Sequence, residues 1–255
     1  MSCTIAITNQ KGGVGKSTTA AALGSGLTLK GYKVLFVDLD PQGNLSYIIQ
    51  ADPAKPSAHD VLTGRAGAAA AIQTAAGGDI IPFSGDLSAA DIELNRTGKE
   101  YRLKEALQPV AGSYDFTIID TPPALGILTI NALTAADRLI IPAQAEIFSL
   151  QGIGQLAGTI NAVKTYCNPA LELDGILLTR HSGRAVLSRD MADMIADTAA
   201  ELGTAVYKTI IREGIAIKEA QANRQSIFAY APKSNAAADY AAFTDEILRG
   251  AGKNE

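Results

Sequence analysis

The chain of 255 residues contains no tryptophan, and aromatic residues make up only 5% of it. Proteins that bind single-stranded nucleic acid stack bases on aromatic side chains, so this mode of binding is disfavoured. The chain also lacks an excess of positive charge, because its formal net charge is −4 at pH 7. Any contact with duplex nucleic acid would therefore come from a local basic patch that attracts phosphates.

Cysteine and histidine are equally scarce. Cys3 and Cys167 lie far apart in the sequence and form no C-x-x-C pair, and His59 and His181 have no metal-binding spacing. Cys3 opens an apolar run, where we expect it to be a small apolar filler. The chain thus offers no ligand set for an iron–sulfur cluster, which needs cysteine pairs.

Long apolar runs and linkers are missing as well. No stretch resembles a signal peptide, and none approaches the ~20 apolar residues of a membrane-spanning helix. We therefore expect a soluble, cytoplasmic protein without a membrane partner. The 10 prolines are scattered, and the 47% of hydrophobic residues suffices for a sizeable core. We expect one domain that spans residues 1–255.

Apolar runs of strand length alternate with helical stretches through most of the chain. The expected strands are Thr4–Thr8, Val34–Asp38, Ile80–Phe83, Phe116–Asp120, Leu139–Pro142, Ile176–Thr179 and Ala205–Thr209. The expected helices are Thr18–Lys30, Glu100–Ala111, Leu150–Tyr166, Ser188–Leu202 and Ala237–Arg249, with a further outer helix in the alanine-rich stretch that ends at Gly77 and Gly78. This alternation predicts the α/β class, with a doubly wound, mainly parallel sheet and helices on both faces.

The most informative segment follows the first expected strand. It reads Asn9-Gln10-Lys11-Gly12-Gly13-Val14-Gly15-Lys16-Ser17-Thr18. Its three glycines allow a tight turn whose N–H groups converge on an anion, and the following helix adds the positive end of its dipole. Lys16 can reach terminal phosphates, and the Ser17 hydroxyl can hold Mg²⁺. The segment therefore predicts a phosphate-binding loop (P-loop) that binds a nucleotide.

A second lysine distinguishes this loop from the ordinary G-x-x-x-x-G-K-[ST] pattern. Lys11 precedes the glycine pair, and Gln10 stands where the ordinary loop has glycine. In this respect the chain resembles the ParA/Soj/MinD family of P-loop NTPases, whose deviant Walker A loop reads K-G-G-x-G-K-[ST]. The resemblance implies that residues 11 to 18 bind ATP and that Lys11 crosses a dimer interface to the partner's phosphates. The alternative is that Lys11 is an ordinary solvated charge.

Carboxylates end two of the expected strands. The second strand runs into Asp38-Leu39-Asp40-Pro41-Gln42-Gly43-Asn44, which is similar to the family's D-x-D-P-Q-G-N. The resemblance implies that Asp40 positions or activates the attacking water, with Asp38 near Mg²⁺. Asp120 ends the strand before Thr121-Pro122-Pro123 and has Walker B character, which suits a carboxylate that supports Mg²⁺ directly or through water. A solvated turn and a strand-capping acid are the structural alternatives.

The resemblance extends through residues 128–137, 141–146 and 174–179, and so covers nearly the whole chain. ParA/Soj proteins commonly carry Pro-Arg-Asn after the last strand, where Pro and Asn line the adenine pocket. The aligned residues here are Arg212, Glu213 and Gly214. The resemblance implies that Arg212 and Gly214 contact the base through backbone groups.

The family's arginines for sequence-independent DNA binding are matched only in part. Arg184 falls at one such position, and Ala216 occupies a second. Other cations could rebuild the patch, because attraction to phosphate depends on charge rather than on fixed positions. These are Arg180, Arg189, Lys218, Arg224 and Lys233. For each, an ordinary surface charge is the alternative interpretation.

Three functions follow as hypotheses. The first is a ParA-type, nucleoid-associated partition ATPase. Its ATP-bound homodimer would bind double-stranded DNA non-specifically until Mg²⁺-dependent hydrolysis, stimulated by a ParB-like centromere-binding partner, returned it to monomers. The second is a MinD-like ATPase that cycles on a membrane through a basic amphipathic tail, although residues 239–255 lack a basic face. The third is a metabolic P-loop enzyme, for which the sequence shows no separate substrate motif.

Overall fold

A seven-stranded sheet forms the centre of the computed structural model, which describes residues 2–75, 77–181 and 186–251. The strands are β1 (Cys3–Ile7), β2 (Val34–Asp38), β3 (Gln73–Ala75), β4 (Gly78–Ile81), β5 (Phe116–Asp120), β6 (Arg138–Ala143) and β7 (Glu172–Leu178). Their order in the sheet is β3-β4-β2-β5-β1-β6-β7. All neighbouring pairs are parallel except β3 and β4, which are antiparallel. The predicted doubly wound, mainly parallel sheet is therefore confirmed.

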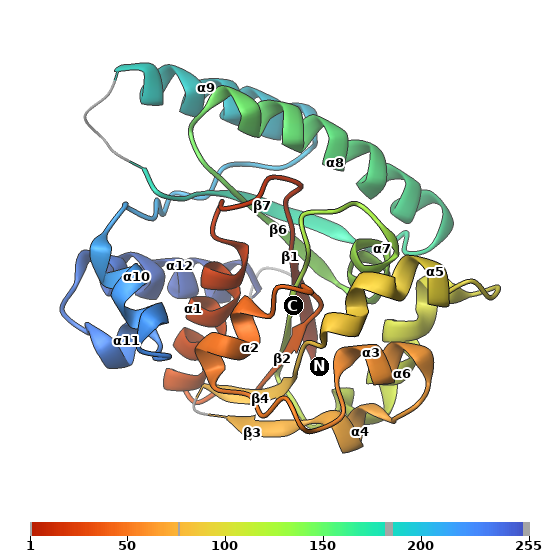
Figure 1. Cartoon of the computed structure of the whole chain (residues 1–255). Helices are drawn as coiled ribbons and strands as arrows, with labels where there is room; N and C mark the ends of the chain where they lie inside the picture. Colours follow the sequence, from red (N-terminus) through yellow and green to blue (C-terminus); the bar gives the residue numbers. More distant parts are fainter. Residues whose placement is uncertain (1, 76, 182–185, 252–255) are drawn as a thin grey trace.

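Helices cover both faces of this sheet (Figure 1). One group consists of α1 (Lys16–Leu29), α2 (Asn44–Ile49), α10 (Ile215–Ala222), α11 (Ile227–Tyr230) and α12 (Asn235–Ala251). The other consists of α3 (Ala58–Thr63), α4 (Ala68–Ala71), α5 (Ala90–Glu93), α6 (Arg102–Ala111), α7 (Ile127–Ala135), α8 (Ile147–Tyr166) and α9 (Val186–Glu201), with the short 3₁₀ helices η1 (Gly85–Ala89) and η2 (Lys99–Tyr101). Figure 1 shows α8 and α9 lying side by side beyond β6 and β7.

The alternation of side chains along β1 explains why both faces need a cover. Ile5 and Ile7 belong to the core cluster that includes buried residues of α1 and α12, whereas Ala6 belongs to the cluster on the opposite face. All three are fully buried. Successive side chains of a strand point to opposite faces of the sheet. A continuous apolar run therefore fits a strand whose sheet is covered by helices on both faces.

Two expected elements were wrong. The segment from Ala205 to Thr209 forms no strand, and within it only Val206 makes an isolated bridge, to Ile176. The alanine-rich stretch forms only the four-residue helix α4 and then β3, rather than one outer helix. Gly78 does not stop a helix but begins β4, with φ of 137° and the carbonyl oxygen of Val34 so close that a Cβ would meet it at 2.7 Å.

Candidate functional site

The glycine-rich loop connects β1 to α1 at the carboxyl edge of the sheet. Gly13 and Gly15 adopt φ values of 77° and 88°, a left-handed conformation that a residue with a Cβ rarely adopts. Helix α1 begins at Lys16 with neither a side-chain cap nor an acidic residue in its first turn. Its first N–H groups are therefore available to an anion.

Side chains from the neighbouring strand ends hold this loop in place. The Thr179 hydroxyl donates to the carbonyl oxygen of Val14 at 2.8 Å, and the Gln144 amide donates to that of Gly13 at 3.2 Å. At the start of the loop, the Asn9 amide donates to the carbonyl oxygen of Pro142 at 2.7 Å. Two of these bonds use carbonyl groups of the loop rather than its N–H groups, whereas the N–H of Lys11 donates to the Asn9 side chain at 2.9 Å.

The two lysines of the loop occupy different surroundings. Lys16 is 6% exposed, and its ammonium donates to the carbonyl oxygen of Lys11 at 3.2 Å. Burial lowers the pKa of Lys16, while the carboxylates of Asp120 and Asp40 act in the opposite direction. The Lys11 ammonium instead forms an ion pair with Glu146, the residue before α8. Lys16 therefore points into the site, and Lys11 is held at its rim.

Asp38 and Asp120 lie opposite each other at the ends of β2 and β5, in direct register. One oxygen of Asp38 accepts from the backbone N–H of Asp40 at 3.1 Å; the other accepts from the backbone N–H and the hydroxyl of Ser46 at 2.8 and 2.7 Å. Burial raises the pKa of Asp38 to about 6, although these hydrogen bonds oppose the shift. The hydrogen bonds of Asp38 thus hold the start of α2.

Asp120 differs, because neither of its buried oxygens accepts a hydrogen bond of normal geometry from the described residues. Burial and then the charge of Asp38 raise its pKa well above the usual range, while the nearby Ser17 hydroxyl and the charge of Lys16 lower it. A buried carboxylate without donors is costly unless a cation compensates it. Mg²⁺ needs few carboxylates because it keeps several waters, so Asp120 and Ser17 fit such an ion. Within the described residues no group of three or more histidine, cysteine or acidic side chains could hold a metal.

A cavity of about 510 Å³ opens in front of the loop. It is lined by Gly12, Gly13, Gly15, Lys16, Ser17, Thr18, Asp40, Gln42, Asn44, Tyr47, Ile48, Pro123, Gln221 and Ala222. Asp40 is almost buried there and accepts from the backbone N–H of Gln42 at 3.0 Å. The predicted loop glycines, Lys16, Ser17, Thr18 and Asp40 thus meet around one cavity, whereas Val14 lies buried beneath it.

A smaller cavity of about 150 Å³ adjoins the first and shares Gly13, Gly15, Thr18 and Gln221 with it. Gly214 and Lys218 are among its lining residues, which places Gly214 where a base could extend from the loop. Arg212 lies outside both linings, because its guanidinium and backbone N–H bond to the carboxylate of Asp239.

The cations expected to meet DNA can be placed only in part. Lys218 lines the smaller cavity, and Arg180 at its mouth pairs with Glu213 at 3.0 Å. The guanidinium of Arg224 lies over the ring of Tyr47, 4.2 Å from its centroid. Arg184 and the side chain of Arg189 lie outside the described residues. These DNA contacts therefore stay predictions.

Several residues that line the site were not predicted from the sequence. Tyr47 comes from α2 and Gln221 from α10, where the Gln221 amide donates to the Thr18 hydroxyl at 2.7 Å. Both belong to helices that no strong periodicity had indicated, and nothing in their local sequence points to the loop. Glu146 lay within a segment similar to the ParA/Soj middle region, but its ion pair with Lys11 depends on the fold.

A glycine-rich loop between β1 and α1, with acids ending β2 and β5, defines a P-loop nucleotide-binding protein with a second loop lysine. A family model described as an AAA domain matches residues 2–173. The chromosome partitioning protein ParA of Caulobacter vibrioides is 40% identical over 251 residues, 96% of this chain and 93% of that protein. The sporulation initiation inhibitor protein Soj of Bacillus subtilis is 40% identical over 248 residues, 95% and 97% of the two chains. The chain belongs to the ParA/Soj family of P-loop ATPases.

A solved structure with a similar fold belongs to a protein that is named as a synthase. The cobyrinic acid a,c-diamide synthase of Mycobacterium smegmatis, with bound ADP and magnesium, has a TM-score of 0.83 and 38% identity. The match covers 100% of this chain and 97% of that one. The likeness in fold therefore includes a protein that holds a nucleotide with magnesium.

Proposed function

We propose that this protein is a ParA-type partition ATPase, which hydrolyses ATP with Mg²⁺ and uses the nucleotide to control its pairing and its hold on DNA. The observation that carries the proposal is the presence of Lys11 and Lys16 in one phosphate-binding loop. One serves the nucleotide of its own subunit, and the other would reach the nucleotide of a second copy. The likeness to ParA and Soj over nearly the whole chain supports this interpretation.

The hydrolytic step assigns a role to each side chain around the cavity. Asp40 accepts a proton from a water whose oxygen bonds to the γ-phosphorus, while the bond to the β–γ bridging oxygen breaks and leaves ADP. Lys16 and the loop N–H groups stabilise the negative charge that develops on the phosphoryl group. Mg²⁺ on Ser17, supported by Asp120 directly or through water, would neutralise further charge. Lys11 of the second subunit completes the charge balance.

The rest of the cycle follows from the requirement for two subunits. Two ATP molecules between two P-loops would join a homodimer, which would bind double-stranded DNA through phosphate contacts and so lie on the nucleoid. A ParB-like centromere-binding partner would stimulate hydrolysis and return the protein to monomers without affinity for DNA. The base would lie in the smaller cavity beside Gly214.

Gel filtration of the wild type and Asp40→Ala with ATP tests this proposal, followed by duplex-DNA binding over a salt series. Asp40→Ala should accumulate as an ATP-bound dimer, because loss of general-base assistance slows hydrolysis by about 10²–10⁴-fold. Its DNA affinity should fall steeply as salt rises. A monomer that hydrolyses ATP at the normal rate would contradict the role of Asp40. A stable dimer without DNA affinity would contradict the partition function.

The MinD-like alternative requires a free amphipathic face near the end of the chain. In α12, the apolar residues Ala236, Ala237, Tyr240, Phe243 and Ile247 are buried in the core. Within the described residues, none of the helices has the length and apolar character needed to cross a bilayer. Sedimentation with liposomes and ATP would favour the alternative only if the protein bound membranes in the absence of DNA.

The name of the M. smegmatis relative raises a synthase reaction as a second candidate. A synthase couples ATP consumption to an acid and an amide donor, whereas a partition ATPase transfers the phosphoryl group to water. Phosphate release should therefore proceed with ATP, Mg²⁺ and DNA alone. A strict requirement for an added carboxylic acid would favour the synthase.

A further inference from the structure

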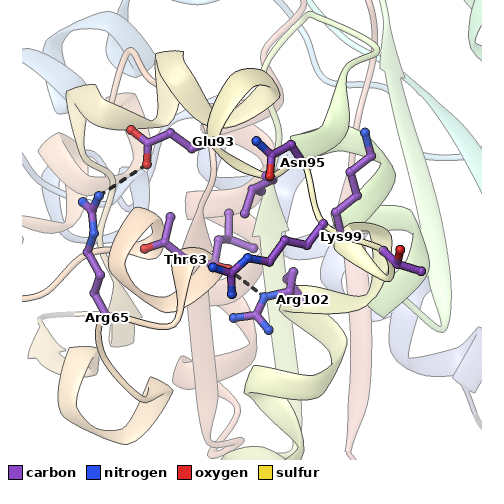
Figure 2. Close-up of a pocket in the computed structure, with 10 residues that line it drawn as sticks. Thr63, Arg65, Glu93, Asn95, Lys99 and Arg102 are labelled. Carbon is purple, nitrogen blue, oxygen red and sulfur yellow. Dashed lines mark hydrogen bonds and ion pairs between the residues drawn. The ribbon is translucent and has the colours of Figure 1, made fainter.

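A second large cavity, of about 470 Å³, lies on the face covered by α3, α5 and α6. None of its lining residues lines either of the two nucleotide cavities. Figure 2 shows that its walls come from the end of α3, from α5, from η2 and from the start of α6. The site is therefore separate from the phosphate-binding loop, and the hydrolytic step gives it no role.

Positive charge is concentrated in this cavity. Four cationic side chains line it, Arg65, Arg96, Lys99 and Arg102, against the single carboxylate of Glu93. The whole chain has a net charge of −4, so this excess is local. Like charges gathered in one concavity repel one another and attract an anion. Such an arrangement suits a ligand that brings negative charge.

The guanidinium groups of Arg102 and Arg65 use only some of their N–H donors in contacts with the described residues. Arg102 donates through Nε to the carbonyl oxygen of Leu62 at 2.9 Å, whereas its two terminal nitrogens form no hydrogen bond with the described residues. Arg65 meets Glu93 only at 3.5 Å (Figure 2). Glu93 also contacts His59 at 3.0 Å. Guanidinium donors thus remain for carboxylate oxygens of a ligand.

The position of Arg102 depends on a glycine. Gly64 ends α3 in the left-handed conformation, with φ of 78°, and the Arg102 guanidinium lies over it. A Cβ at Gly64 would approach a terminal nitrogen of Arg102 to 2.8 Å. The absence of a side chain at this point leaves room for the guanidinium at the wall of the cavity.

The surroundings of the cavity disfavour a long polyanion. Acids lie on the segments that form the cavity: the exposed Asp91 on α5, the half-buried Glu100 on η2 and the exposed Glu105 on α6. They would repel a duplex that extended beyond the cavity, and a concave site does not match the rod shape of DNA. Leu62 and Leu94 also line the cavity, but at 0% and 6% exposed they offer almost no surface to a ligand. The exposed apolar side chain beside the cavity is Ile92, which precedes Glu93 on α5 and is 78% exposed. A matching ligand therefore combines negative charge with an apolar group.

We propose that this cationic cavity binds an acidic peptide segment of a protein partner, with carboxylates on the arginine and lysine side chains of the cavity and an apolar residue against Ile92. The proposal goes beyond the nucleotide cycle and does not depend on it, because the peptide would bind without ATP.

Fluorescence anisotropy of the full chain with a labelled hexapeptide of four glutamates and two leucines tests the proposal. The peptide should bind, and affinity should fall as salt rises. Arg96→Gln combined with Lys99→Gln should weaken binding about 10-fold, because two exposed ion pairs are lost. Lys104→Gln on α6, which removes an exposed cation outside the cavity, should leave binding unchanged. Unfolding temperatures of both variants establish that they fold.

The outcomes separate the possible ligands. Absence of peptide binding, or equal binding by the double variant, would overturn the proposal. Displacement of the peptide by pyrophosphate or by duplex DNA at a lower concentration than by unlabelled peptide would overturn it too, in favour of a phosphate ligand. Because all arms omit ATP, failure here would leave the ATPase proposal untouched, and failure of the ATPase proposal would leave this one untouched.

Discussion

Lys11 forms an ion pair with Glu146, so the second lysine of the loop already has a carboxylate partner in the monomer. The two side chains are partly exposed, at 24% and 42%. A lysine that is to reach phosphates in a second subunit would have to exchange this carboxylate for a phosphate oxygen. The ion pair therefore competes with the proposed dimer.

Replacing Glu146 by alanine should favour the dimer. The ATP concentration needed for half-maximal dimerisation should fall by up to about 5-fold, because partly exposed ion pairs are worth only about 0.2–1 kcal/mol. Gel filtration over an ATP series measures this change. Glu201→Ala, at the exposed end of α9, serves as the control for loss of one negative charge. Weaker dimerisation of Glu146→Ala would show that Glu146 assists pairing instead.

The buried carboxylate of Asp120 accepts no hydrogen bond of normal geometry from the described residues, and it should cost stability until a cation binds. Asp120→Asn removes a buried charge, so the ligand-free protein should become more stable by about 1 kcal/mol. The same variant should lose most of the rise in unfolding temperature that ATP and Mg²⁺ give the wild type. Differential scanning fluorimetry measures both effects, with the exposed Asp193→Asn as control. An equal rise in both proteins would remove Asp120 from the magnesium site.

The sequence sufficed to predict the loop and the acid-ended strands because both are local patterns. The glycines at 13 and 15 take the positive φ values that the motif needs, and Asp38 and Asp120 end continuous apolar strands. The strand order then brings Asp38 and Asp120 together without further information, since the carboxyl ends of parallel strands share one edge.

Features that depend on distant partners were not predictable. Strand β3 has little apolar alternation, and it exists because Gln73 to Ala75 pair with β4 at the edge of the sheet. Residues 205–209 look similar in composition to a strand, but their backbone pairs with β7 only at Ile176. The cationic cavity joins residues from four segments, and Arg102 reaches it only because α3 ends at Gly64.

Glu246 of α12 should make stability depend on pH in the acid range. Burial would raise its pKa, but hydrogen bonds from Thr209 and Lys208 and the charge of Arg249 lower it below its ordinary value of 4.5. The carboxylate accepts from the backbone N–H groups of Lys208 at 2.8 Å and Thr209 at 2.9 Å. Because the folded state binds this proton less tightly, the stabilisation is present above pH 4.5 and is lost as pH falls below it.

Urea unfolding of Glu246→Gln against the wild type measures this contribution. The variant should be less stable by about 1 kcal/mol at neutral pH, and the difference should shrink toward about pH 3 as Glu246 is protonated. Glu172→Gln removes an exposed carboxylate of β7 and should show neither effect. A difference that grew as pH fell would contradict the assigned direction of the pKa shift.

Two glycines in helices should respond in opposite ways to the same substitution. Gly24 lies in α1 where a Cβ would overlap the ring of Phe36, which is fully buried on β2. Gly158 lies in α8 with no atom within 4 Å of a Cβ. Gly24→Ala should therefore destabilise the protein by about 1–3 kcal/mol through overpacking. Gly158→Ala should stabilise it by roughly 0.5–1 kcal/mol, because alanine loses less backbone entropy in a helix. Urea unfolding of both variants tests the packing of α1 on the sheet, and a stabilising Gly24→Ala would mean that Phe36 can move away from the helix that begins the phosphate-binding site.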